Sequence, residues 1–91
     1  MRTYLITYNL VFTENGPLSL SLINKIKSYQ YWAKPIPNVW LIKTTSDLHT
    51  VINYLKQDLY PGDKILIIEV NDNWVSLNLD QDVVKWMQKG L

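Results

Sequence analysis

Cysteine is absent from this sequence of 91 residues, and histidine occurs only once, as His49. Without cysteine the chain forms no disulfide, has no thiol nucleophile and offers no thiolate ligand to a metal. A single histidine leaves a histidine-rich metal site without ligands, and we expect His49 to be an ordinary surface residue. The three glycines stand far apart, so there is no glycine-rich phosphate loop. We therefore expect no cofactor and no metal.

Long hydrophobic runs are also missing from the chain. The run Ile65–Ile68 is typical of the longest ones, far short of the roughly 20 residues that span a bilayer. The first residues lead directly into a strand-like pattern, which is unlike a signal peptide. We expect a small, soluble, cytoplasmic protein with no membrane partner. A hydrophobic content of 47% and a net charge of +1 favour one folded domain, residues 1–91, over a disordered chain.

The small net charge hides an uneven distribution along the sequence. Residues 16–46 contain four lysines and no acid, whereas the residues from Asp47 onward carry seven acids and four lysines. A local basic patch attracts phosphates, so one interpretation is contact with DNA or RNA. The candidate residues are Lys25, Lys27, Lys34 and Lys43. The other interpretation, an ordinary solvated surface, stays open.

Alternating and helical patterns together predict the order β-α-β-β-α-β followed by a last helix. Strands are predicted at residues 3–11, 31–34, 39–44 and 64–70, with a short edge segment at 74–76. Apolar residues at steps of three and four predict helices after Pro17 and after Ser46, which is the expected N-cap of the second. Asp80 is the expected cap of the final helix.

This order is typical of an α+β fold. We predict a ferredoxin-like β-α-β-β-α-β two-layer sandwich, with an antiparallel sheet, both helices on one face and a short C-terminal helix in addition. The second strand belongs at an edge of the sheet, because Pro35 and Pro37 are not tolerated in a central ladder.

Both faces of the predicted sheet are apolar, although helices cover only one face of a two-layer sandwich. In the last strand, for example, Ile65 and Ile67 alternate with Leu66 and Ile68. The second face must be covered either by another copy of the chain or by the C-terminal helix, and we favour a homodimer through the sheet faces. The expected interface residues are Tyr4, Ile6, Tyr8, Trp40, Trp74 and Trp86. Strand aromatics can also stack on nucleic-acid bases or pack in a core.

Several segments of the sequence resemble a known family. They are residues 3–10 (TYLITYNL), 39–44 (VWLIKT) and 66–70 (LIIEV), followed by Asn73–Trp74 and the late Trp86. They are similar to the SinR-like small proteins, which are related to the CRISPR spacer-acquisition protein Cas-two. The resemblance runs over nearly the whole chain. It implies a ferredoxin-like fold, a homodimer whose two sheets face each other, and association with nucleic acid.

The same resemblance bears on catalysis. Some Cas-two proteins are metal-dependent nucleases, in which a Tyr-Asp pair at the end of the first strand supplies the metal-binding aspartate. The matching pair here is Tyr8–Asn9, and an amide lacks the negative charge that would hold Mg²⁺. The arginine-rich second strand that is common in Cas-two proteins is also missing. We therefore expect no catalytic residue, and a protein that is not an enzyme.

Three functions remain open from the sequence. The favoured one is a non-catalytic, Cas-two-like homodimer that contacts nucleic acid or a nucleoprotein partner. The first alternative is a protein-interaction or assembly module that binds no nucleic acid. The second alternative is a weak metal-dependent nuclease.

Overall fold

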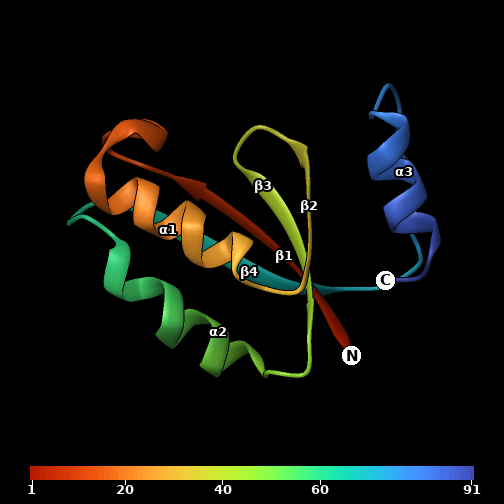
Figure 1. The fold of residues 1–91 in the computed structure, drawn as a ribbon, viewed down its shortest axis with the longest axis horizontal. Helices are drawn as coiled ribbons and strands as arrows, with labels where there is room; N and C mark the ends of the chain where they lie inside the picture. The colour runs from red at the N-terminus through yellow and green to blue at the C-terminus, as the bar shows by residue number, and fades with distance from the viewer.

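The computed structural model describes residues 1–91 and contains four strands, three α-helices and two short 3-10 turns (Figure 1). The strands are β1 (Arg2–Asn9), β2 (Tyr31–Ile36), β3 (Val39–Thr44) and β4 (Lys64–Val70). The helices are α1 (Pro17–Lys27), α2 (Leu48–Leu55) and α3 (Gln81–Gln88), and the 3-10 turns are Thr13–Asn15 and Lys56–Asp58. None of the helices is long and apolar enough to cross a membrane.

The four strands form one antiparallel sheet in the order β2-β3-β1-β4. Thr3 of the central strand β1 pairs with Lys43 of β3 on one side and with Val70 of β4 on the other. Helices α1 and α2 lie together on one face of the sheet, and α3 stands apart from them beside β2 (Figure 1). The predicted ferredoxin-like α+β sandwich with an additional C-terminal helix is therefore confirmed.

Strand β2 lies at an edge, as its prolines predicted, but it is longer than expected. It runs through Pro35 to Ile36, and its register with β3 shifts between Ala33 and Ile36. Proline is tolerated at such a bulge on an edge strand, because the missing N–H would have had no ladder partner. The prediction that this strand ends at Lys34 is therefore wrong.

Helix α2 begins one residue later than predicted. The N-cap is Asp47, whose Oδ1 accepts the backbone N–H of Thr50 at 2.8 Å. A carboxylate suits this position because it both satisfies a free N–H and faces the positive end of the helix. The predicted cap, Ser46, instead uses its backbone carbonyl to accept the hydroxyl of Tyr4 at 2.7 Å.

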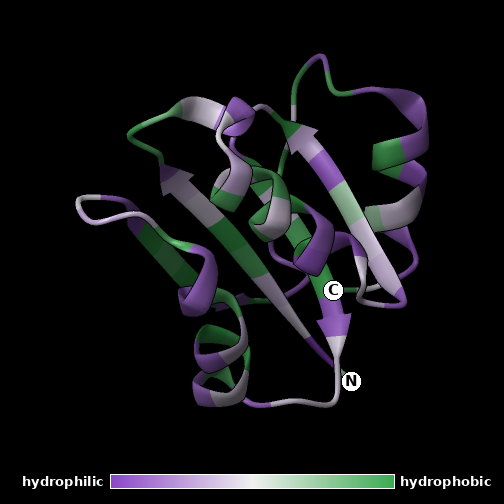
Figure 2. Ribbon diagram, turned by 60° about the vertical axis from the view of Figure 1, so that its left-hand side comes forward, coloured by the Kyte–Doolittle hydropathy of each residue, from purple (hydrophilic) through white to green (hydrophobic).

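The core lies between the sheet and the helices α1 and α2. Its buried residues come from the central strands and from the inward stripes of both helices: Tyr4, Ile6, Tyr8, Leu10, Leu22, Ile23, Ile26, Trp40, Ile42, Val51 and Leu55. Figure 2 shows green, hydrophobic segments on several strands and both hydrophobic and hydrophilic segments on the helices.

Four residues predicted for a dimer interface belong to this core instead. Tyr4, Ile6, Tyr8 and Trp40 lie on the sheet face that the helices cover, and all four are buried. The alternation of side chains along β1 and β3 places them on one face, as expected, but that face is the helix-covered one. The prediction that they form an interface between copies is therefore wrong.

Candidate interaction site on the open sheet face

The face of the sheet that points away from α1 and α2 is also apolar, and we call it the open face. The register places Leu41 of β3, Leu5 of β1 and Ile68 of β4 in one row across it. An antiparallel sheet whose second face meets water normally carries polar side chains there. This row therefore indicates a surface that another element or molecule covers.

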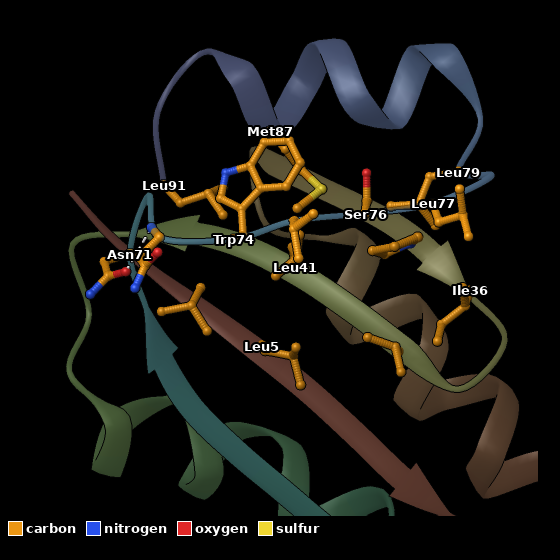
Figure 3. Close-up of a pocket in the computed structure, with 15 residues that line it drawn as sticks. Leu5, Ile36, Leu41, Asn71, Trp74, Ser76, Leu77, Leu79, Met87 and Leu91 are labelled. Carbon is orange, nitrogen blue, oxygen red and sulfur yellow. Dashed lines mark hydrogen bonds between the residues drawn. The ribbon is translucent and has the colours of Figure 1, made fainter.

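Part of the open face is covered by residues 71–91, which we call the C-terminal arm. Figure 3 shows Trp74 and Met87 of the arm above Leu41 and Leu5 of the sheet. The sequence left two candidates for covering this face, a second copy and the C-terminal helix. The chain itself supplies part of this cover. Residues 74–76, predicted as a short strand, lie in this arm and form no strand.

A cavity of about 400 Å³ lies between the arm and the sheet. It is lined by 15 residues, of which 11 are hydrophobic. Figure 3 places Asn71 at one end of the cavity and Ile36 near the other, with Leu5 and Leu41 on its floor. The arm therefore covers the sheet without filling the space beneath it.

The arm is attached to the rest of the chain without hydrogen bonds. Its own hydrogen bonds are internal: the Asn73 N–H donates to Asn71 Oδ1 at 2.9 Å, and the Leu91 N–H donates to Asp72 Oδ1 at 2.6 Å. The one charged contact across the junction is the ammonium of Lys43, 4.4 Å from the ring centre of Trp86. Apolar packing and this cation–π contact hold the arm in place.

The half of the open face over β4 stays uncovered, and we call it the bare half. Leu66 is 55% exposed and Ile68 is 44% exposed. Val75 and Leu77 of the arm, which also line the cavity, are 94% and 84% exposed. Large apolar side chains gathered on one surface are typical of sites that contact another molecule, because burying them away from water is favourable.

A polar network closes the end of the helix-covered face. The Tyr8 hydroxyl donates to Glu14 Oε1 at 2.6 Å and accepts the Trp40 Nε1–H at 2.8 Å. The Lys34 ammonium donates to the same Glu14 oxygen at 3.1 Å. The hydroxyl of Tyr8 and then the ammonium of Lys34 lower the pKa of Glu14, while burial and the Glu14 carboxylate raise the pKa of Tyr8.

The four candidate lysines do not form one patch. Lys25 pairs with Asp58 at 3.1 Å, and Lys43 lies at the arm on the open face. Lys27 and Lys34 do lie together, 5.9 Å and 4.9 Å from the ring centre of Trp40. Of the four, Lys27 and Lys43 form no ion pair with an acid.

Asn9 is exposed at the end of β1, opposite Lys64 of β4. No group of three or more histidine, aspartate or glutamate side chains lies close enough together to hold a metal ion. His49 is exposed on α2, as expected.

Two of the predicted interface residues lie in the arm. Trp74 lines the cavity, and Trp86 contacts Lys43, so neither belongs to the core. Four exposed apolar residues were not among the predicted interface residues: Leu66, Ile68, Val75 and Leu77. The signal available in the sequence is that residues 65–68 are apolar on both faces of the strand, so Leu66 and Ile68 need a covering of their own.

Comparisons of this chain with protein-family models, with curated proteins and with solved structures found no match. The candidate site is therefore defined by its geometry: an open sheet face with a covered half, a bare half and a cavity beneath the arm.

Proposed function

We propose that this protein is a non-catalytic, homodimeric assembly protein that associates with a second copy through the bare half of its open face. The observation that carries the proposal is the joint exposure of Leu66 and Ile68 on β4 and of Val75 and Leu77 on the arm. One chain thus offers two apolar surfaces with no partner in the monomer.

A second copy is the economical partner for these surfaces. In a two-fold dimer, β4 of one chain meets the arm of the other and the reverse contact follows by symmetry, so one self-complementary surface is enough. Strand β4 is also an edge of the sheet, with one side of its backbone unpaired. The resemblance to the SinR-like proteins and Cas-two, which implies homodimers, also favours self-association.

Sedimentation at micromolar concentration tests the proposal. The wild type is expected to be a dimer, and Leu66→Lys a folded monomer, because the substitution places a charge in the interface. The matched control is Leu20→Lys on α1, since Leu20 is 53% exposed against 55% for Leu66. This control should remain a dimer. A wild-type protein that sediments as a monomer at this concentration contradicts the proposal.

Contact with nucleic acid is the second candidate, carried by the cluster of Lys27, Lys34 and Trp32. Trp32 is 38% exposed, its ring centre lies 5.5 Å from that of Trp40, and the ammonium of Lys27 lies 5.6 Å from it. An exposed indole beside a free ammonium can stack on a base and contact its phosphate.

A salt titration with single-stranded and duplex oligonucleotides tests this second candidate. Binding should weaken as salt rises, and Lys27→Gln should reduce the slope by about one phosphate contact. Lys56→Gln, on the 3-10 turn after α2, is the control with the same charge change. Absence of binding to either substrate at low salt rules out this candidate and leaves the homodimer proposal intact.

A further inference from the structure

We propose that the cavity beneath the C-terminal arm binds a small neutral amphiphile, a molecule with an apolar body and one uncharged hydrogen-bonding end group. The proposal goes beyond self-association, and it shares two residues with the surface proposed for the dimer, because Val75 and Leu77 also line the cavity.

The size and the walls of the cavity fit such a ligand. Its volume of about 400 Å³ lies within the range of roughly 300–1,000 Å³ that is typical of small-molecule sites. Leu5 and Leu41 supply an apolar floor, and Leu79 and Met87 supply apolar walls on the arm side (Figure 3). An apolar ligand that packs against these side chains removes apolar surface from water, which is favourable.

Two asparagines lie at one end of the cavity, while the hydroxyl of Ser76 lies apart from them, nearer to Leu77 (Figure 3). Figure 3 places Asn71 at this end, with Asn73 hydrogen-bonded to it, and places Ile36, which pairs with Val39, near the other. The Asn73 backbone N–H occupies Asn71 Oδ1, which leaves the amide NH₂ of Asn71 and the whole side-chain amide of Asn73 without a hydrogen-bond partner. These groups can donate to and accept from one polar end group of a ligand.

The charge of the lining selects the kind of end group. No side chain among the lining residues is charged. A carboxylate or phosphate placed there would find no cationic side chain in the lining and would lose part of its hydration, although Asn71 and Asn73 are themselves exposed to water. An amide or hydroxyl needs only the hydrogen bonds that Asn71 and Asn73 offer. The ligand class is therefore neutral.

The arm also offers a way in. Because no hydrogen bond joins residues 71–91 to the sheet, the arm can separate from it by giving up only apolar packing and the contact between Lys43 and Trp86. A second copy of the chain is the other conceivable occupant. The arm already covers this half of the face, however, so a second copy meets the arm and not the floor of the cavity.

Binding of Nile red, a neutral dye whose emission rises in apolar surroundings, tests the proposal. We expect the wild type to bind the dye, and Leu5→Trp to lose most of this binding because the larger side chain fills the cavity floor. The matched control is Leu20→Trp on the outer side of α1, which should bind as the wild type does. Leu79→Trp fills the cavity from the arm, and serves if Leu5→Trp does not fold by circular dichroism.

Competition then tests the end group, with amphiphiles kept below their micelle-forming concentrations. Decanamide should displace the dye at a concentration about tenfold lower than decanoate does, a difference set by the cost of desolvating the carboxylate. Equal displacement by both compounds overturns the neutral-ligand assignment. Unchanged dye binding in folded Leu5→Trp and Leu79→Trp overturns the site itself.

Sedimentation of the same samples separates this proposal from the homodimer. Dye binding by a protein that is a monomer supports the cavity site and contradicts only the homodimer. Dye binding that disappears as the protein concentration rises through dimer formation shows that the second copy fills the cavity, and it overturns the proposal.

Discussion

The two faces of the sheet carry side chains of similar hydrophobicity but differ in what lies over them. On the helix-covered face, Tyr4, Ile6 and Trp40 are almost completely buried under α1 and α2. On the open face, neighbouring residues of the same sheet, Leu66 and Ile68, keep about half of their surface exposed to water. The difference shows that the alternating pattern of a strand determines that a face is to be buried, whereas the partner that buries it comes from elsewhere.

The largest expected effect is a difference in how much a substitution on each face lowers the free energy of unfolding. Trp40→Ala should destabilise the protein by about 3–5 kcal/mol. The substitution empties a packed site under the helices and removes the Trp40 Nε1–H that donates to the Tyr8 hydroxyl. Leu66→Ala should cost less than about 0.5 kcal/mol in dilute solution, as expected for an exposed residue. Urea denaturation monitored by circular dichroism measures both values.

Protein concentration sharpens this comparison. If a second copy covers the bare half, the cost of Leu66→Ala should grow as the wild type becomes dimeric, while the cost of Trp40→Ala stays the same. A cost for Leu66→Ala that equals that of Trp40→Ala at the lowest measurable concentration would mean that the bare half is covered within one chain.

A smaller effect concerns the helix that covers the first face. Asp47→Ala should destabilise the protein by about 1 kcal/mol, because the N–H of Thr50 loses its acceptor at the start of α2. Ser46→Ala is the matched control, and it should be nearly neutral because the Ser46 hydroxyl makes no hydrogen bond in the structure. Thermal unfolding of both variants measures the difference. The reverse order of effects would restore Ser46 as the cap.

The smallest effect is a pH dependence at the end of the helix-covered face. The folded-state pKa of Glu14 is lowered by Tyr8 and Lys34, so its contribution to stability is present above its unfolded pKa of about 4.3. That contribution is lost as the pH falls through the folded-state value. Glu14→Gln removes this contribution at every pH. The melting temperature of the variant should therefore fall less steeply than that of the wild type as the pH drops below about 4.3.

The partial exposure of Glu14 and Lys34 limits the size of this effect to under about 1 kcal/mol. Tyr8→Phe keeps the Glu14 carboxylate but removes the hydroxyl that donates to it. The melting temperature of this variant should therefore fall with acid less steeply than that of the wild type and more steeply than that of Glu14→Gln. Parallel curves for the wild type and both variants would contradict the stabilising role of this network.

Much of the fold can be predicted from residue patterns. Strand β3 begins and ends where a run without glycine or proline predicts, at Val39 and Thr44. The prolines at 35 and 37 place β2 at an edge, and the order of elements leads to the sheet order β2-β3-β1-β4. These features depend on local propensity and on short connections, which the sequence displays directly.

The site could be predicted only in part. Alternation places Tyr8 and Trp40 on one face and Leu5 and Leu41 on the other, but the pattern is equally apolar on both. Which face receives α1 and α2 depends on the handedness and length of the crossovers, so the aromatic face was assigned to the interface wrongly. The network around Glu14 joins residues from the end of β1, a 3-10 turn and β2, and no local spacing predicts it.

The position of β1 at the centre of the sheet also determines when it can be completed. Both partners of this strand come later in the chain, and its pairing of Thr3 with Val70 must wait until β4 has been made. During synthesis, which proceeds at about 5–20 residues per second, the first strand emerges with its apolar side chains and has no edge to join for several seconds. The β2–β3 hairpin, by contrast, can close as soon as its turn is made. The N-terminal strand is therefore the segment of this protein that most needs protection from wrong pairing in the newly made chain.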